Sequence, residues 1–310
     1  MKHSKVTVVG AGFVGATAAQ RIVEKDLADV VLVDIVEGLP QGKALDIMES
    51  ASVEGFSRRI LGSNLYEDTA GSDVIVITAG LARKPGMSRD DLLFKNAEIV
   101  GGIVTACAKY SPEAVLVMVT NPLDVMTWLA QKKSGFPAER VIGMAGELDS
   151  ARYAYFTAEK LMCKPADVKA VVLGGHGDQM VPVPELTEVQ GKPLPSMMDA
   201  VMIGQINQRT RNGGAEIVAL LKTGSAYYAP SSSAVKMVRA ILQDTGEVIP
   251  SCVYLDGQYG LKDVYCGVPA QLGRGGVKKI VEVRLTEEER LELHRSAADV
   301  RQNFLKLNIS

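Results

Sequence analysis

The sequence VTVVGAGFVG, residues 6–15, decides the fold class of this chain. A short, mostly β-branched run is followed by Gly10, Gly12 and Gly15 in the spacing G-x-G-x-x-G, and residues 16–25 then have the composition of a helix. Glycine leaves no side chain in the way of a phosphate, and the free N–H groups at a helix start attract its charge. The stretch therefore predicts a strand, a phosphate-binding turn and a helix, with the three glycines as dinucleotide contacts.

A second apolar strand, residues 30–33, ends at Asp34, which lies 19 residues after Gly15. An acidic side chain at this spacing can accept hydrogen bonds from the ribose hydroxyls of an adenosine. The same carboxylate repels the 2′-phosphate of NADP, and the next residue, Ile35, offers no positive charge to neutralise it. The cofactor predicted is therefore NAD, although Asp34 could instead simply end the strand.

Three further apolar runs, residues 74–77, 115–119 and 141–144, are separated by segments of helix length. Such strands alternating with helices indicate a parallel sheet covered on both faces. The fold class expected is α/β, with a Rossmann-type doubly wound sheet in an NAD-binding domain of residues 1–145.

The carboxyl ends of these strands should face the ligand crevice. Thr120 and Asn121 follow one of them and are expected near the cofactor, and Asn96 is included in the same set. Because Asn121 precedes Pro122, it also fits the N-cap of a helix, and capping explains it nearly as well as cofactor binding does.

The pattern changes after residue 145. We expect long helices over 146–162, 197–222 and 231–242, the second of them broken or bent near Gly213, and a terminal helix that starts at a capping box headed by Thr286. Between them come a strand over 168–173 and an antiparallel meander over 248–256, 264–268 and 277–283. The sequence thus predicts a second, mixed α+β domain of residues 146–310 that carries the substrate site.

Composition excludes several classes of function. The 34 Lys and Arg nearly balance the 36 Asp and Glu, so no global positive field is available to hold nucleic acid or an anionic membrane. The 4 cysteines are far apart, without the close pairs of zinc or redox sites, and we expect free thiols and no metal. With no apolar run of about 18 residues and no signal segment, the expected location is the cytoplasm.

His176 is one of only 3 histidines, and it lies between glycines after the predicted strand 168–173. Glycines leave an imidazole open to a small molecule, although a glycine turn that carries a histidine by accident gives the same pattern. Asp149 and Arg152 are three apart on the predicted helix 146–162, so they should lie on one face of it. These residues are the first candidates for chemistry.

The segment 81–91 is basic, follows a sheet strand and contains a Pro-Gly pair. It has the character of a mobile loop that brings Arg83 and Arg89 over a bound substrate and expels water. The alternative is a solvated surface turn, in which basic residues are common.

Taken together, these stretches resemble the NAD-dependent 2-hydroxy-acid dehydrogenases that comprise lactate and malate dehydrogenase. The resemblance covers nearly the whole chain and includes the glycine turn, Asp34 and residues 82–89, 119–122, 148–152 and 174–178. It implies direct hydride transfer between NAD and a 2-hydroxy acid, and a homodimer or homotetramer.

The resemblance also implies roles for individual residues. His176 would donate and accept the substrate proton, and Asp149 would orient its ring. Arg152 would bind the first carboxylate of the substrate, Arg89 would polarise the carbonyl, and Asn121 would hydrogen-bond near the nicotinamide or the substrate.

Arg83 bears on the choice of acid. Lactate enzymes of this family carry a neutral glutamine at the matching place, whereas malate enzymes carry an arginine that faces a second carboxylate. The resemblance therefore implies malate and oxaloacetate as substrates, with Ser225 as a small residue that would leave room for them. The alternatives are a lactate dehydrogenase or a non-catalytic dinucleotide-binding protein.

Overall fold

The computed structural model describes residues 4–81 and 86–309. Its centre is a nine-stranded sheet with the order β14-β13-β12-β6-β5-β4-β1-β2-β3. Six parallel strands form the first part of it, β1 Lys5–Val9, β2 Asp29–Val33, β3 Ile60–Ser63, β4 Val74–Ile77, β5 Val115–Met118 and β6 Val141–Gly143. The strand order reverses beside β1, and this switch point is where a doubly wound sheet holds its ligand. The predicted fold class is confirmed.

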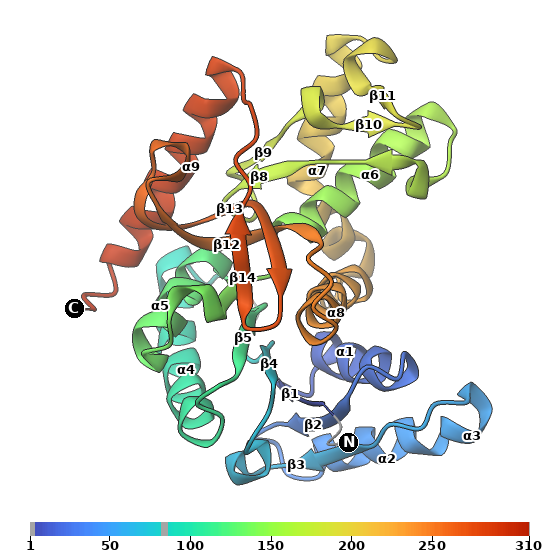
Figure 1. Ribbon diagram of the computed structural model, residues 1–310, viewed down its shortest axis with the longest axis vertical. Coiled ribbons are helices and arrows are strands. Elements are labelled where there is room, and N and C mark those ends of the chain that lie inside the picture. The colour runs from blue at the N-terminus through green and yellow to red at the C-terminus, as the bar shows by residue number, and fades with distance from the viewer. Residues whose placement is uncertain (1–3, 82–85, 310) are drawn as a thin grey trace.

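Helices cover both faces of this sheet, which explains why β4 and β5 are apolar at every position and buried throughout. In Figure 1, α4 and α5 lie on one side and α1 and α8 on the other. The helices are α1 Phe13–Glu24, α2 Leu39–Glu49, α3 Ala51–Glu54, α4 Arg89–Tyr110, α5 Leu123–Ser134, α6 Gly146–Leu161, α7 Ala200–Leu221, α8 Tyr228–Leu242 and α9 Glu287–Leu305. Short 3₁₀ turns are η1 Tyr66–Thr69, η2 Ala138–Arg140, η3 Pro165–Asp167, η4 Pro184–Leu186, η5 Leu194–Ser196 and η6 Gln258–Gly260.

The predicted antiparallel meander consists of β12 Val248–Asp256, β13 Lys262–Gly273 and β14 Gly276–Ile280. It forms no sheet of its own. Instead β12 pairs antiparallel with β6, where Cys252 lies opposite Gly143, so the meander extends the parallel sheet. A sequence pattern reveals strands but not their partners, and this long-range pairing therefore could not be predicted.

Two smaller sheets lie in the second half of the chain. One joins β7 Val168–Lys169, β10 Glu188–Val189 and β11 Lys192–Pro193, and the other joins β8 Val172–Gly174 and β9 Met180–Pro182. The single strand predicted over 168–173 is therefore wrong, because β7 and β8 pair with different partners.

The break predicted near Gly213 is also wrong, since α7 is one continuous helix. The capping box that starts α9 is present as predicted, with the Thr286 hydroxyl accepting from the N–H of Glu289. No helix within residues 4–81 and 86–309 is both long and apolar enough to cross a membrane.

Candidate active site

The glycine turn after β1 packs tightly against the sheet on one side and is open on the other. A Cβ at Gly15 would lie 1.8 Å from the carbonyl oxygen of Gly10, and one at Gly10 would lie 2.7 Å from the backbone nitrogen of Ala79. At Gly12, by contrast, a Cβ would meet nothing within 4 Å. Gly12 is also the N-cap of α1 and supplies no side-chain cap, so the first N–H groups of the helix stay available. This arrangement fits the pyrophosphate of a dinucleotide.

Asp34 follows β2 and is fixed against the same turn. Its Oδ2 accepts from the N–H of Ala11 at 2.7 Å, and its Oδ1 accepts from the N–H of Val36 at 3.0 Å. The Nζ of Lys43 donates to the carbonyl of Ala11 at 2.7 Å. Since carboxylate oxygens accept more than one hydrogen bond, Asp34 keeps acceptor capacity for ribose hydroxyls beside the glycine turn.

The loops after β4 and β5 are held together by buried side chains. Asn96 is fully buried, and its Nδ2 donates to the carbonyls of Asn121 and Leu81 at 2.7 and 3.1 Å while its Oδ1 accepts from the N–H of Leu81 at 2.8 Å. The Thr120 hydroxyl donates to the carbonyl of Ala79 at 2.6 Å. Asn96 and Thr120 therefore fix the loops after β4 and β5 to each other, and a direct cofactor contact by either stays a prediction.

Asn121 does not cap the helix that follows it, so that expectation is wrong. The N-cap of α5 is Pro122, the Asn121–Pro122 peptide is cis, and the helix begins at Leu123. Asn121 itself is exposed at the carboxyl end of the parallel strands. Ser225, which we expected near the pocket, is exposed in the segment between α7 and α8.

His176, Asp149 and Arg152 lie together at the start of α6 and the end of β8. The Nδ1 of His176 is 2.9 Å from Oδ2 of Asp149, and Nη1 of Arg152 is 3.5 Å from Oδ1 of the same carboxylate. Asp149 is 2% exposed, so one buried carboxylate contacts both the imidazole and the guanidinium. The face that the three-residue spacing predicted is formed, and His176 joins it from 27 residues away.

The charges in this cluster shift one another. Burial works to lower the pKa of His176, but the charge and hydrogen bond of Asp149 outweigh it, and the net pKa is raised. Burial lowers the pKa of Arg152, against the opposing effect of Asp149. The Nε of Arg152 is buried and has no hydrogen-bond partner in the described part of the chain. A buried donor without a partner is costly, so this guanidinium is suited to an added carboxylate.

We had expected Arg89 to lie in a loop, but it is the first residue of α4. Ser88 and Asp91 form a capping box that starts the helix there. The Nη2 of Arg89 is 2.8 Å from Oδ2 of Asp178, two residues beyond His176, and both side chains are largely exposed. This ion pair brings the guanidinium to the histidine loop. Arg83 lies outside the described residues.

Comparison with known proteins separates two parts of the chain. Residues 4–143 match the family model for the lactate/malate dehydrogenase NAD-binding domain, and residues 146–308 match the α/β C-terminal domain of the same family. The chain belongs to the lactate/malate dehydrogenase family. Its first part is the NAD-binding domain of that family, and the protein is an NAD-dependent oxidoreductase.

Curated relatives include a malate dehydrogenase of Synechocystis sp., 58% identical over 97% of this chain and 93% of the relative, and one of Chloroherpeton thalassium, 56% identical over 98% of each. Among solved structures, a malate dehydrogenase of Cryptosporidium parvum matches with a TM-score of 0.97 and 42% identity over 99% of each chain. A lactate dehydrogenase of the same organism, solved with lactic acid and NAD, matches with a TM-score of 0.96 and 41% identity over 100% of this chain and 99% of that one. The backbone of the family thus serves both acids, and substrate choice must rest on side chains.

Sequence reasoning gave no role to three polar residues around the histidine loop. Asp178 pairs with Arg89, while Asp124 and Ser296 accept hydrogen bonds from the loop backbone. Asp124 did carry a signal, because it is a charged residue at the start of the otherwise apolar stretch of α5. Ser296, on α9, carried none.

Proposed function

We propose that the protein is a malate dehydrogenase that catalyses reversible hydride transfer between (S)-malate and NAD, giving oxaloacetate and NADH. The observation that carries this proposal is the contact of both His176 and Arg152 with one buried carboxylate, that of Asp149, and we infer that this cluster is the substrate site. Curated malate dehydrogenases, one of them 58% identical, support the choice of acid.

His176 exchanges the proton of the substrate. Because its Nδ1 is held by Asp149 at 2.9 Å, its Nε2 is the atom left to face the substrate oxygen. In malate oxidation the neutral imidazole accepts the hydroxyl proton at Nε2, and the Asp149 carboxylate stabilises the imidazolium that results. In the reverse direction the imidazolium returns the proton to the carbonyl oxygen. The raised pKa of His176 favours this charged form.

Arg152 binds the carboxylate next to the reacting carbon. Its buried Nε has no hydrogen-bond partner within residues 4–81 and 86–309, and a planar guanidinium can take a carboxylate with two parallel hydrogen bonds. Two glycines of α7 lie beside it: a Cβ at Gly213 would be 3.3 Å from Cδ of Arg152, and one at Gly214 would be 3.7 Å from its Nη2. Since glycine weakens a helix interior, their value here is the room they leave around this side chain.

Arg89 and Arg83 complete the substrate contacts in this proposal. Arg89 exchanges its exposed pairing with Asp178 for the substrate carbonyl, where it stabilises negative charge on the oxygen. Arg83 pairs with the second carboxylate. Pyruvate would leave that guanidinium without a partner in a closed site, and breaking such a pair costs about 3 to 5 kcal/mol.

The residues at the glycine turn fit NAD. The open face of Gly12 and the uncapped start of α1 would hold the pyrophosphate, and Asp34 would hold the adenosine ribose. Bound NAD supplies the hydride acceptor. In this proposal residues 1–145 bind the cofactor, and Asn96, Thr120 and Asn121 line the crevice. Residues 146–310 contain the groups that exchange the proton.

The test is a matrix of initial rates with oxaloacetate and pyruvate, each with NADH and NADPH. We expect turnover to be fastest with oxaloacetate and NADH. A preference for pyruvate would establish the lactate dehydrogenase alternative. The fold does not distinguish the two activities, because a lactate dehydrogenase structure matches this chain with a TM-score of 0.96. Absence of turnover with every pair, with NADH still bound, would establish a non-catalytic dinucleotide-binding protein.

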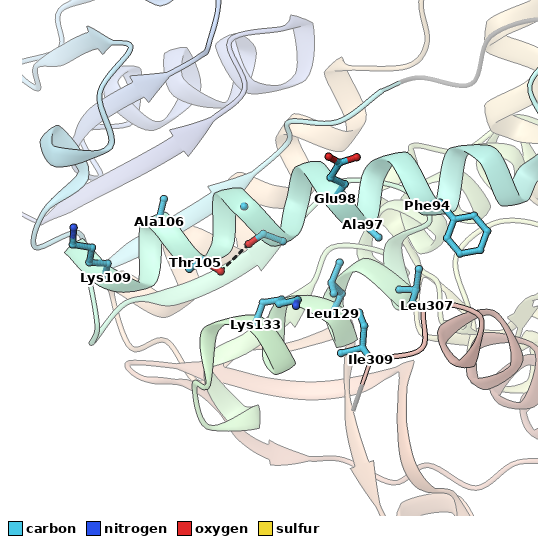
Figure 2. Close-up of a pocket in the computed structure, with 12 residues that line it drawn as sticks. Phe94, Ala97, Glu98, Thr105, Ala106, Lys109, Leu129, Lys133, Leu307 and Ile309 are labelled. Carbon is cyan, nitrogen blue, oxygen red and sulfur yellow. Dashed lines mark hydrogen bonds between the residues drawn. The ribbon is translucent and has the colours of Figure 1, made fainter.

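We also propose a homodimer or homotetramer in the cytoplasm, without nucleic-acid or membrane partners. A groove of about 700 Å³ runs between α4, α5 and the C-terminal residues, away from His176. Figure 2 shows Leu129, Leu307 and Ile309 lying along this groove on one side of α4, and we propose the groove as the contact between two copies of the chain. All four cysteines are free, as expected for a reducing compartment.

Light scattering tests the assembly. Gly102 lines the groove, and a Cβ there would meet nothing within 4 Å, so Gly102→Glu should leave the fold intact and convert the oligomer to monomer. Gly204→Glu on α7, where a Cβ is equally free, is the matched control. If the wild-type protein is a monomer, the proposed oligomer is wrong. If Gly102→Glu is still an oligomer, the interface lies outside this groove.

A further inference from the structure

The loop that carries His176 is held by hydrogen bonds to two side chains, one on α5 and one on α9. Oδ2 of Asp124, in the first turn of α5, accepts from the backbone N–H of His176 at 2.8 Å. The hydroxyl of Ser296, on α9, accepts from the N–H of Gly175 at 2.7 Å. Two successive backbone N–H groups of the loop are therefore fixed by acceptors that lie 52 and 121 residues away in the sequence.

Both acceptors are buried, and the loop backbone lies directly on them. Asp124 is 5% exposed and Ser296 is fully buried. A Cβ at Gly175 would lie 3.2 Å from the Ser296 hydroxyl and 3.4 Å from Oδ2 of Asp124. Gly174 has φ +82° and Gly177 has φ +102°, so glycines on each side allow the close approach. The position of His176 is thus set by its backbone as well as by its ring.

Asp124 is energetically unfavourable at its buried position. It lies among the buried apolar residues of α5, beside the thiol of Cys252, and burial raises the pKa of its carboxyl. A carboxyl in such surroundings destabilises the fold unless its hydrogen bonds compensate, and an apolar residue would avoid the cost. The hydrogen bond from the His176 N–H to Oδ2 offsets part of this penalty, while Oδ1 has no hydrogen-bond partner among the described residues.

We propose that Asp124 and Ser296 are positioning residues for His176. By fixing the N–H groups of residues 175 and 176, they keep the imidazole at hydrogen-bond distance from Asp149 and aim Nε2 at the substrate oxygen. Neither side chain touches the substrate, and both act through the loop. A displacement of about 1 Å in a catalytic group can cost on the order of 10²-fold in rate, so a small shift of this loop is enough to matter. The turnover readout rests on the proposed function.

Ser296→Ala tests the proposal with Ser111→Ala as the matched control. Ser111 is equally buried, accepts from the N–H of Ser72 at 3.1 Å and donates to the carbonyl of Thr69 at 2.7 Å, away from the histidine loop. We expect Ser296→Ala to lower kcat by about tenfold, with the NADH dissociation constant unchanged. Ser111→Ala should lose a similar amount of thermal stability and keep wild-type kcat.

Asp124 is tested with two substitutions. Asp124→Asn keeps an oxygen acceptor for the N–H of His176 and should keep kcat within about threefold of wild type, whereas Asp124→Leu removes the acceptor and should lower kcat on the order of 10²-fold. An equal loss in both would overturn the proposed role of the acceptor. If Asp124→Leu fails to fold, Ser296→Ala and Asp124→Asn still decide.

A second readout does not need turnover. Only 3 histidines are present, so the ring signals of His176 can be assigned in NMR spectra with His176→Asn and titrated in the NADH-bound protein. Among the described residues, the charged groups that act on this ring are Asp149 and Arg152 on α6 and Asp124 on α5. Ser296→Ala changes none of them, so a fall in the His176 pKa in that variant reports a ring that has moved from Asp149.

A His176 pKa and kcat in Ser296→Ala that match those of Ser111→Ala would overturn the proposal. A wild-type protein inactive with oxaloacetate would instead overturn the proposed function, and the titration would still test the positioning.

Discussion

Asp149→Asn is the sharpest perturbation of the site, because one buried carboxylate supports both cations. Its oxygens lie 2.9 Å from Nδ1 of His176 and 3.5 Å from Nη1 of Arg152. Asparagine has nearly the same shape and removes the charge. Its amide can also donate to Nδ1, and the proton of a neutral ring would then move to Nε2, the atom that must accept a proton from malate.

The size of the effect follows from Coulomb's law. Two unit charges about 4 Å apart attract by about 4 kcal/mol at an effective dielectric constant of about 20. If the imidazolium loses that stabilisation where the proton is transferred, kcat falls by about 10³-fold. The value lies within the about 10²- to 10⁴-fold that general acid–base groups contribute.

The assay is NADH oxidation by oxaloacetate over a pH series. Reduction needs the imidazolium, so the wild-type rate should be high below the raised pKa of His176 and fall above it. In Asp149→Asn the falling limb should move to lower pH. Glu147→Gln is the control, since Glu147 is the other acidic residue in the first turn of α6 and pairs with Lys236 at 2.9 Å. A kcat within tenfold of wild type, with the limb unmoved, would refute this account of Asp149.

Three further predictions follow from the same site. Arg83→Gln should shift the ratio of kcat/KM for oxaloacetate over pyruvate toward pyruvate by on the order of 10²-fold, and an unchanged ratio would show that another group binds the second carboxylate. Asp34→Ser should raise the KM for NADH and reduce the preference for NADH over NADPH, because the carboxylate that accepts from the ribose and its repelling charge are lost together. If the variant and the wild type have the same KM for each cofactor, Asp34 has no role in cofactor binding. The raised pKa of His176 should add stability that is fully present below its unfolded value of about 6.5 and is lost as the pH rises through the folded value. Urea denaturation at pH 6 and 8.5 should show a smaller pH-dependent loss for His176→Asn than for wild type, and an equal loss would assign the effect to other groups.

The sequence predicted those parts of the site that depend on the spacing of residues close together in the chain. The glycine turn, the acid at the end of β2 and the shared face of Asp149 and Arg152 all follow from strand and helix periods, and the structure has each of them. The family resemblance added the pairing of His176 with Asp149.

What could not be predicted depends on contacts between distant segments. Asp124 and Ser296 reach the histidine loop from 52 and 121 residues away, and no period in the chain records such a partner. Gly213 misled the prediction for the same reason. A glycine in a helix suggests a break, and only the tertiary contact with Arg152 shows that the missing side chain serves packing.

The pairing of β12 with β6 has a mechanical consequence. Because one sheet runs from the cofactor-binding half into the second half, the pairing of β12 with β6 opposes a hinge motion that would swing the two halves apart. Substrate access must then depend on local rearrangement around the crevice. The same continuity couples the halves in unfolding: losing β12 would leave β6 paired with β5 alone and expose its other edge, so calorimetry should record a single cooperative transition for the chain.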